Sequence, residues 1–207
     1  MKTLYSTVVY FVMTIILCGP VCAEEEWASL FNGKDLHGWH TLPGGNWEVK
    51  NGMIVGTDDP SEKRHGLLVT DRQYDDFDVR LQFKMTDGDS GFYFRAEESG
   101  DQVGVHGFQV EVDTTYETGG LYETGGRGWV VQPNVDELKE HYRPGEWTKL
   151  ELSAHEGNVI VKINGYQTAE LKADKGRRTG HLALQLHGGQ KMHVEYKDIE
   201  IRLPAKN

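Results

Sequence analysis

The sequence predicts an all-β fold, a jelly-roll sandwich of two antiparallel sheets with one short helix. Short segments with alternating apolar and polar side chains recur from Trp47 onward, as in strands that bury one face. Asn-Gly pairs, which favour tight hairpin turns, separate several of these segments. No Gly/Ser-rich or Pro-rich linker divides the chain, so we expect the strands to form one domain.

Two hairpins are expected at Asn-Gly pairs. The first joins strands 47–49 and 53–55 through Asn51-Gly52, and the second joins 159–163 and 166–168 through Asn164-Gly165. A third turn is expected at Gly157-Asn158, directly before the second hairpin. The remaining alternating segments are expected to be strands as well: 77–85, 90–95, 107–113, 149–152, 181–187 and 194–201.

Segment 77–85 has the clearest strand pattern. Its expected core face carries four apolar residues at every second position: Val79, Leu81, Phe83 and Met85. The sequence predicts one helix, over 134–142. Asn134 can cap it, Glu137 follows three residues later, and Pro144-Gly145 ends it.

The N-terminal segment has the pattern of a secretory signal peptide over residues 1–23. Lys2 supplies a basic start, an apolar run covers 8–18, and Val21-Cys22-Ala23 offers small residues for cleavage near Ala23. A membrane anchor is the alternative, but the run of roughly 11 residues is short of the about 20 that a spanning helix needs. We therefore expect a secreted or periplasmic protein with one mature domain, 24–207, and no membrane anchor.

The cysteine and charge content limits the redox chemistry and the partners that are expected. Both cysteines, Cys18 and Cys22, lie in the expected signal segment, so disulfides and thiol chemistry are not expected in the mature chain. The net charge of the whole chain is -10, and it becomes about -11 when Lys2 is removed. Such an acidic chain is a poor ligand for polyanions, which argues against nucleic acid as a partner.

Three expected strands place unusual polar residues opposite an apolar face. The segments are 90–95, 107–113 and 181–187. If they are neighbours in one sheet, their polar residues converge on one face: Tyr93, Arg95, Gln109, Glu111, Asp113, Gln185 and His187. A solvated sheet face with an ion pair between Arg95 and an acid is the simpler alternative, worth about 0–1 kcal/mol when exposed.

Segment 119–129 combines a glycine-rich loop with aromatic and charged residues. An aromatic ring can stack on a sugar and a guanidinium can bond its hydroxyls, which favours a carbohydrate groove over a phosphate site. The expected binding residues from this segment are Tyr122, Glu123, Arg127 and Trp129. A packed Trp129 with a locally paired Arg127 is the alternative. His40, His65, His141 and His155 are expected at the surface.

Several motifs along the chain resemble one known family. They are the opening Trp27–Trp39 segment, Tyr74–Phe77, Ser90–Arg95, the Gln109/Glu111/Asp113 strand, Gly119–Tyr122, Arg127–Trp129, Pro144–Trp147, Ile163–Gly165 and Leu184–Gly188. In this order they resemble the 3-keto-disaccharide hydrolase domain family, over about residues 27–203. The resemblance implies a concanavalin A-like jelly roll, export, and action on glycosides with a ketone at the sugar C3.

A C3 ketone acidifies the C2 proton, so the resemblance implies cleavage by proton removal, elimination and later hydration. Glu111 is the expected base, Arg95 the stabiliser of the enediolate, and His187 the acid for the leaving oxygen. Many family members carry Glu then Gln where this chain has Gln109 then Glu111, so the resemblance alone does not name the base. A non-catalytic, lectin-like carbohydrate-binding module of the same fold is the alternative function.

The expected partner is a small carbohydrate substrate, with a separate sugar 3-dehydrogenase acting upstream to form the ketone. The sequence requires no cofactor, because no compact metal-ligand motif is present. A divalent metal ion (Ca or Mn) is the open alternative, with Glu111, Asp113 and His187 as its candidate ligands.

Overall fold

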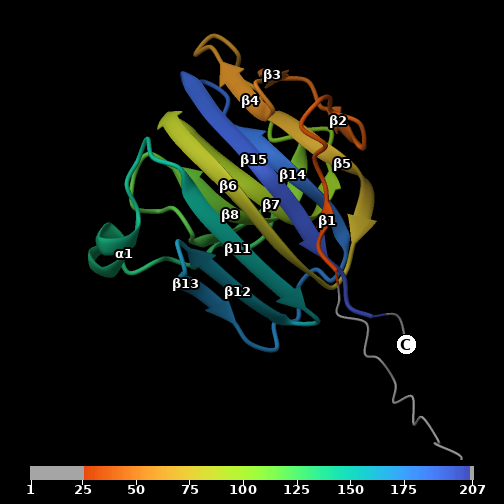
Figure 1. The fold of residues 1–207 in the computed structure, drawn as a ribbon, viewed down its shortest axis with the longest axis vertical. Helices are drawn as coiled ribbons and strands as arrows, with labels where there is room; N and C mark the ends of the chain where they lie inside the picture. The colour runs from red at the N-terminus through yellow and green to blue at the C-terminus, as the bar shows by residue number, and fades with distance from the viewer. Residues whose placement is uncertain (1–25, 206–207) are drawn as a thin grey trace, which may run out of the picture.

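The computed structural model describes residues 26–205, which form two antiparallel β-sheets stacked face to face and one short helix. Figure 1 shows the two layers, with the helix at the outer edge beside strand β13 (Tyr166–Leu171). The signal segment expected at 1–23 lies outside the described residues. No helix within 26–205 is long and apolar enough to cross a membrane.

One sheet has eight strands, and its edge-to-edge order is β13-β12-β11-β6-β15-β4-β3, with β1 paired to β15. The strands are β13 (Tyr166–Leu171), β12 (Asn158–Ile163), β11 (Thr148–His155), β6 (Phe77–Asp87), β15 (Met192–Arg202), β4 (Met53–Asp58), β3 (Asn46–Lys50) and β1 (Ala28–Ser29). Neighbours in this order are antiparallel.

The other sheet has seven strands in the order β10-β9-β8-β7-β14-β5-β2. They are β10 (Gly128–Val131), β9 (Leu121–Thr124), β8 (Val105–Asp113), β7 (Asp89–Glu98), β14 (Gly180–Leu186), β5 (Gly66–Tyr74) and β2 (Trp39–Thr41). The three polar segments expected to be neighbours, in β7, β8 and β14, are adjacent strands at the centre of this sheet. Together the two sheets confirm the predicted jelly-roll sandwich.

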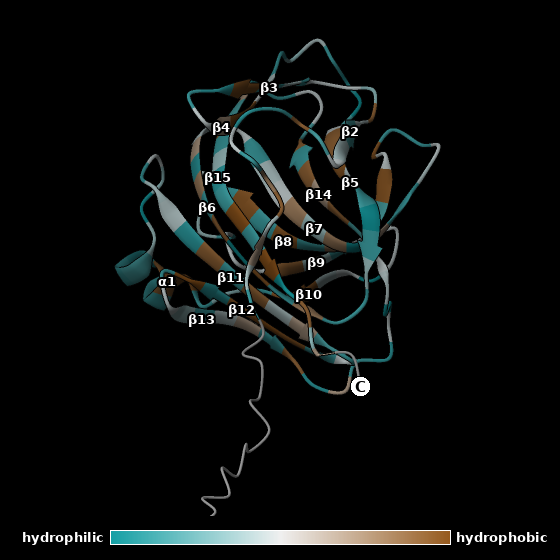
Figure 2. Cartoon of the chain, turned by 45° about the vertical axis from the view of Figure 1, so that its right-hand side comes forward, coloured by the Kyte–Doolittle hydropathy of each residue, from teal (hydrophilic) through white to brown (hydrophobic). Residues whose placement is uncertain are grey.

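The main core lies between the sheets and follows the alternation read from the sequence. Val79, Leu81, Phe83 and Met85 of β6 are at most 1 % exposed, which confirms the expected core face. Figure 2 shows this alternation as bands of brown and teal along the strands. A smaller apolar cluster lies on the outer face of the seven-stranded sheet: Leu67, Val69, Tyr93, Ala96, Val105 and Ala183, with Leu42 packed on it.

The expected turns and helix are present with one shift. Asn51-Gly52 and Asn164-Gly165 form two-residue turns, and all four residues have the positive φ that such hairpins require. The third turn lies at Glu156-Gly157, one residue earlier than predicted, because Asn158 already starts β12. Helix α1 covers Val135–His141, and the Asn134 side chain accepts from the first-turn N–H groups.

Candidate functional site

Cross-strand register places polar residues of the seven-stranded sheet in rows on its outer face. Gly91 of β7 lies opposite Glu111 of β8, and Tyr93 lies opposite Gln109. Gln109 in turn lies opposite Tyr122 of β9. Directly opposed residues point to the same face of a sheet, so these side chains form one surface.

Two histidines and an aspartate form a further row at the ends of the same strands. Leu186 of β14 pairs with Gly66 of β5, which places the next residue, His187, opposite His65. The two imidazole centroids are 4.3 Å apart. The His187 backbone N–H also donates to the Asp89 backbone carbonyl at 3.2 Å, so Asp89 of β7 continues the row.

These rows line a cavity of about 390 Å³. Its lining residues come from five strands and from loops: His65, Asp89, Tyr93, Val103, Gln109, Glu111, Glu117, Tyr122, Thr124, Trp129, Gln185 and His187. Seven of the eleven predicted site residues are among them. The cavity therefore joins carboxylates, amides, imidazoles and aromatic rings.

An amide network fixes the floor of the cavity. Gln109 Nε2 donates to Glu111 Oε2 at 2.7 Å and to Gln185 Oε1 at 3.2 Å. Gln185 Nε2 donates to His65 Nδ1 at 2.8 Å and to the Tyr93 hydroxyl at 3.3 Å. Each amide hydrogen in this chain thus has an acceptor, which holds the side chains in one arrangement.

Glycine at position 91 makes room for this network. A Cβ there would lie 2.4 Å from Gln109 Nε2 and 2.6 Å from its Cδ. Any larger residue would push the Gln109 side chain away from Glu111 and Gln185. Gly91 is therefore a positioning element of the cavity floor.

Glu111 is a buried carboxylate among other acids. It is 8 % exposed, and burial raises its pKa well above the usual range of a glutamate. The charges of Asp89, Asp113 and Glu117 raise the pKa further, while the hydrogen bond from Gln109 opposes the shift. When ionised, Glu111 is consequently a stronger base than an exposed glutamate.

Asp89 has a related environment. Burial is the largest cause that raises its pKa to about 6, and the charges of Asp113 and Glu117 add to the shift while His187 lowers it. Asp89 and Glu111 therefore place two carboxyl groups of raised pKa in one cavity, a combination that is common at functional sites.

The two histidines present different nitrogens to hydrogen-bond partners. His187 Nδ1 lies 2.9 Å from the Gly188 carbonyl, so that nitrogen carries a hydrogen. His65 Nδ1 accepts from Gln185, so its hydrogen is on Nε2. Burial, with His187 adding a smaller effect, lowers the pKa of His65 to about 4, which keeps its ring neutral at neutral pH.

The aromatic end of the cavity lies at the sheet edge. Trp129 of β10 is 36 % exposed, and its ring meets Tyr122 edge to face with centroids 5.6 Å apart. Tyr122 lies opposite Trp129 in the β9–β10 pairing. The prediction that both residues belong to the groove is consistent with this placement, whereas the packed position considered for Trp129 is not.

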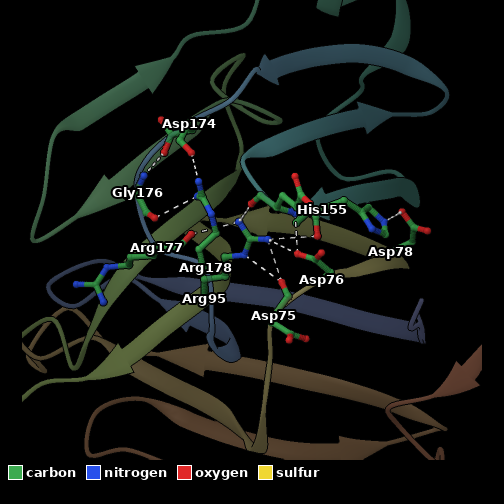
Figure 3. A network of polar contacts seen from close by, with 11 residues as sticks. Asp75, Asp76, Asp78, Arg95, His155, Asp174, Gly176, Arg177 and Arg178 are labelled. Atoms are coloured by element: carbon green, nitrogen blue, oxygen red, sulfur yellow. Dashed lines mark hydrogen bonds and ion pairs between the residues drawn. The ribbon is translucent and has the colours of Figure 1, made fainter. Parts of the chain in front are cut away.

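The expectation that Arg95 shares this cavity is wrong. The guanidinium is buried and bonds the carbonyls of Asp75, Glu156 and Arg177, and it pairs with Asp76 at 3.2 Å (Figure 3). The register between β7 and β8 shifts between Phe94 and Glu97, and Arg95 has a φ of 50°. This bulge breaks the alternation, so Arg95 does not follow Tyr93 onto the cavity face.

Asp113 also does not line the cavity, although it has the same parity as Glu111. Its carboxylate accepts from Thr115 N at 3.0 Å and Thr118 Oγ1 at 2.7 Å, and from the Thr115 hydroxyl. It therefore closes the turn after β8. This removes Asp113 as a substrate-binding residue and separates it from the other candidate metal ligands, Glu111 and His187.

Within residues 26–205 no group of three His, Cys, Asp or Glu side chains is arranged to hold a metal ion. The expected ligand set does not fit such an ion, since the carboxylate of one member, Asp113, is hydrogen-bonded within the turn after β8. Glu111, Asp113 and His187 therefore do not form a metal site.

The predicted binding residues Glu123 and Arg127 pair with each other instead of lining the cavity. Glu123 lies opposite Phe108, an inward residue, so it takes the opposite face from Tyr122. Arg127 also pairs with Asp174 at 2.6 Å and lies over the Phe108 ring. The alternative of a locally paired Arg127 is thus the correct one.

Two important cavity residues were not identified from sequence. Asp89 has the parity of Gly91 and Tyr93, so extending the alternation by two positions would have found it. His65 was expected at the surface, and only the pairing of β5 with β14 reveals its position beside His187.

Comparisons with known proteins agree with this architecture. Residues 26–202 match the model of the 3-keto-alpha-glucoside-1,2-lyase-like domain family. No curated protein matches the chain.

Solved structures share the fold at low identity. A crystal structure of a provisionally named glycosyl hydrolase from Parabacteroides distasonis has 22 % identity and a TM-score of 0.63, covering 86 % of this chain and 94 % of that one. The carbohydrate binding module CBM66 from Bacillus subtilis has 14 % identity and a TM-score of 0.61, with coverages of 80 % and 96 %. A Bacillus subtilis protein with a galectin-like fold has 14 % identity and a TM-score of 0.60, with coverages of 82 % and 90 %.

Proposed function

Because the chain belongs to the 3-keto-alpha-glucoside-1,2-lyase-like domain family, a carbohydrate-related family, we propose that it cleaves the glycosidic bond of 3-keto-glycosides. The observation that carries this proposal is the position of Glu111. It is a buried carboxylate of raised pKa on the floor of a polar cavity, and Gln109 holds it at 2.7 Å.

The reaction begins with transfer of the C2 proton to the Glu111 carboxylate. The electron pair of the C2–H bond forms a C2–C3 double bond, and the ketone oxygen takes the negative charge. The enolate then re-forms the ketone as a C1–C2 double bond appears and the bond from C1 to the leaving oxygen breaks. Water adds later, with its hydroxyl at C1 and its proton at C2, so no oxidant or reductant is consumed.

His187 supplies the proton for the leaving oxygen in this proposal. Its Nδ1 is occupied by the Gly188 carbonyl, so the proton to be transferred is on Nε2 of the imidazolium. Asp89 follows in the same row, and its carbonyl accepts from the His187 backbone N–H. Glu111 and His187 lie on strand β8 and at the end of β14, two strand spacings apart, or about 10 Å between strand axes. That separation leaves room for a sugar ring between base and acid.

The aromatic pair Tyr122 and Trp129 is the proposed stacking surface for a sugar ring of the substrate. It lies at the β9–β10 edge, on the other side of Glu111 from the histidines, so it contacts the part of the substrate that is farthest from the leaving oxygen. Export by the 1–23 segment and an upstream sugar 3-dehydrogenase complete the proposal, because the ketone must be formed before the C2 proton becomes acidic.

The test compares matched disaccharides with and without the C3 ketone, each in the presence and absence of a chelator. We expect monosaccharide release only from the oxidised member, and release that persists with the chelator. Glu111→Gln should abolish release while retaining binding, whereas Glu140→Gln on the exposed face of α1 should leave both unchanged. Binding of sugars without release by the wild-type protein would instead indicate a lectin-like module and refute the proposal.

A further inference from the structure

Arg95 lies outside the cavity. The proposed reaction therefore needs another group to stabilise the negative charge on the ketone oxygen. Such a group must be a hydrogen-bond donor, must face the cavity, and must not already be bonded within the protein. Within residues 26–205, the cavity-lining donors differ sharply in this respect.

Most side-chain donors in the cavity are already used. Both hydrogens of the Gln109 amide go to Glu111 and Gln185, and both hydrogens of the Gln185 amide go to His65 and Tyr93. Thr124 Oγ1 donates to Gln109 Oε1 at 3.5 Å, so the hydrogen of the Tyr93 hydroxyl points to Thr124 Oγ1 at 2.8 Å. These groups shape the cavity but have no hydrogen left for a substrate oxygen.

Tyr122 and Trp129 also carry donors, but they lie at the β9–β10 edge, away from His187. His65 is the unused donor beside His187. The hydrogen bond from Gln185 occupies its Nδ1 lone pair, which forces the hydrogen onto Nε2. No hydrogen bond to Nε2 is found among the described residues, and the ring lines the cavity beside His187. The Nε2–H group is therefore available to a substrate oxygen in the cavity.

We infer that His65 donates a hydrogen bond from Nε2 to the C3 ketone oxygen of the substrate and stabilises the enolate. The inference rests on the proposed function and assigns one of its catalytic residues. No proton is transferred at His65: Glu111 receives the C2 proton, the ketone oxygen gains charge, and the Nε2–H bond stays intact. Gln185 is the positioning residue that fixes the ring and its tautomer.

The two neighbouring histidines thus have different proposed roles, a hydrogen-bond donor and a proton donor, because their Nδ1 atoms make different hydrogen bonds. His65 bonds an amide hydrogen through Nδ1 and offers a hydrogen at Nε2, whereas His187 donates from Nδ1 to a carbonyl and offers a lone pair or a proton at Nε2. The centroid distance of 4.3 Å is short enough for both rings to contact one sugar ring, one at the C3 oxygen and the other at the C1 oxygen.

A series of 3-keto-glucosides with leaving groups of increasing basicity separates the two roles. His65→Phe keeps a ring against His187 but has no donor, and we expect kcat to fall about 10²- to 10³-fold by a similar factor for every leaving group. His65→Gln, which restores an N–H donor, should recover part of the loss. His187→Gln should lose most with the most basic leaving group and least with the best one. His37→Gln, an exposed histidine outside the cavity, should match the wild type.

The outcomes distinguish this inference from the proposed function. A wild-type protein that releases nothing from any 3-keto-glucoside refutes the proposed function itself. A wild type that is active while His65→Phe stays within twofold of it refutes only the role of His65. A His65→Phe loss that rises steeply with leaving-group basicity also refutes it, since that pattern marks an acid at the leaving oxygen.

Nitrogen-15 spectra of the histidine rings test the structural premise without any substitution. At pH 8 we expect the Nε2–H tautomer for His65 and the Nδ1–H tautomer for His187. Observation of the Nδ1–H tautomer at His65 would overturn the inference even if every variant failed to fold.

Discussion

Asp89→Asn should make the protein more stable at neutral pH, although it alters the proposed active site. The Asp89 carboxylate accepts no hydrogen bond from the described residues, and it lies among other acids. Its pKa is raised from 3.8 to about 6 in the folded protein, with burial as the main cause. An asparagine of the same shape removes the charge that burial disfavours.

The sign and size of the effect follow from that shift. The folded protein binds more protons than the unfolded chain between pH 3.8 and about 6, so stability falls as the pH rises through this window. The cost is fully present above the window, and a shift of about two pKa units corresponds to about 3 kcal/mol as an upper value, because Asp89 is only half-buried.

Urea unfolding at pH 4 and pH 8 measures this. We expect Asp89→Asn to raise the unfolding free energy at pH 8 by up to about 3 kcal/mol and to change it little at pH 4. Glu140→Gln, which removes an exposed carboxylate, serves as the control and should shift neither value. An Asp89→Asn protein that is equally stable or less stable than the wild type at pH 8 would refute the electrostatic description of the cavity.

Further predictions concern the elements that hold the cavity and those that lie outside it. Arg95→Met should lower the unfolding free energy by several kcal/mol, since hydrogen bonds from charged groups contribute about 1.5–3 kcal/mol each, yet kcat should be unchanged where the variant is folded; a selective loss of kcat would show that Arg95 acts in the reaction. Gly91→Ala should reduce turnover at least about tenfold, or about 1.4 kcal/mol, because the new Cβ would displace Gln109; normal turnover would show that the amide network is dispensable. Trp129→Ala should raise KM for disaccharides more than it lowers kcat, as measured by initial rates, and an unchanged KM would show that Trp129 does not contact the substrate.

The sequence predicted the architecture well because that architecture depends on local patterns. The period of two in 77–85 requires only that alternate residues face a core, and the two Asn-Gly pairs demand the positive φ values that the hairpins have. The same parity placed Gln109, Glu111 and Gln185 on one face, and the pairing of β7 with β8 and β14 brought those residues together.

The failures arose where parity is interrupted or where pairing is long-range. A bulge at Arg95 places its side chain on the other face of the sheet. No residue type in that segment predicts a bulge. Asp113 lies on the predicted face of its strand, but its carboxylate accepts hydrogen bonds from the nearby Thr115 and Thr118. His65 came to the cavity through a pairing with a strand about 120 residues away, which alternation cannot predict.

Deuterium at C2 of a 3-keto-disaccharide tests most directly whether the cavity removes that proton. We predict that the 3-keto sugar released in ordinary water has lost the C2 deuterium. Glu111→Gln should release neither sugar nor deuterium. The released sugar incubated without protein, sampled at the same times, corrects for spontaneous exchange. Full retention of deuterium in the sugar released by the wild-type protein would contradict elimination and would mean that Glu111 is not the base.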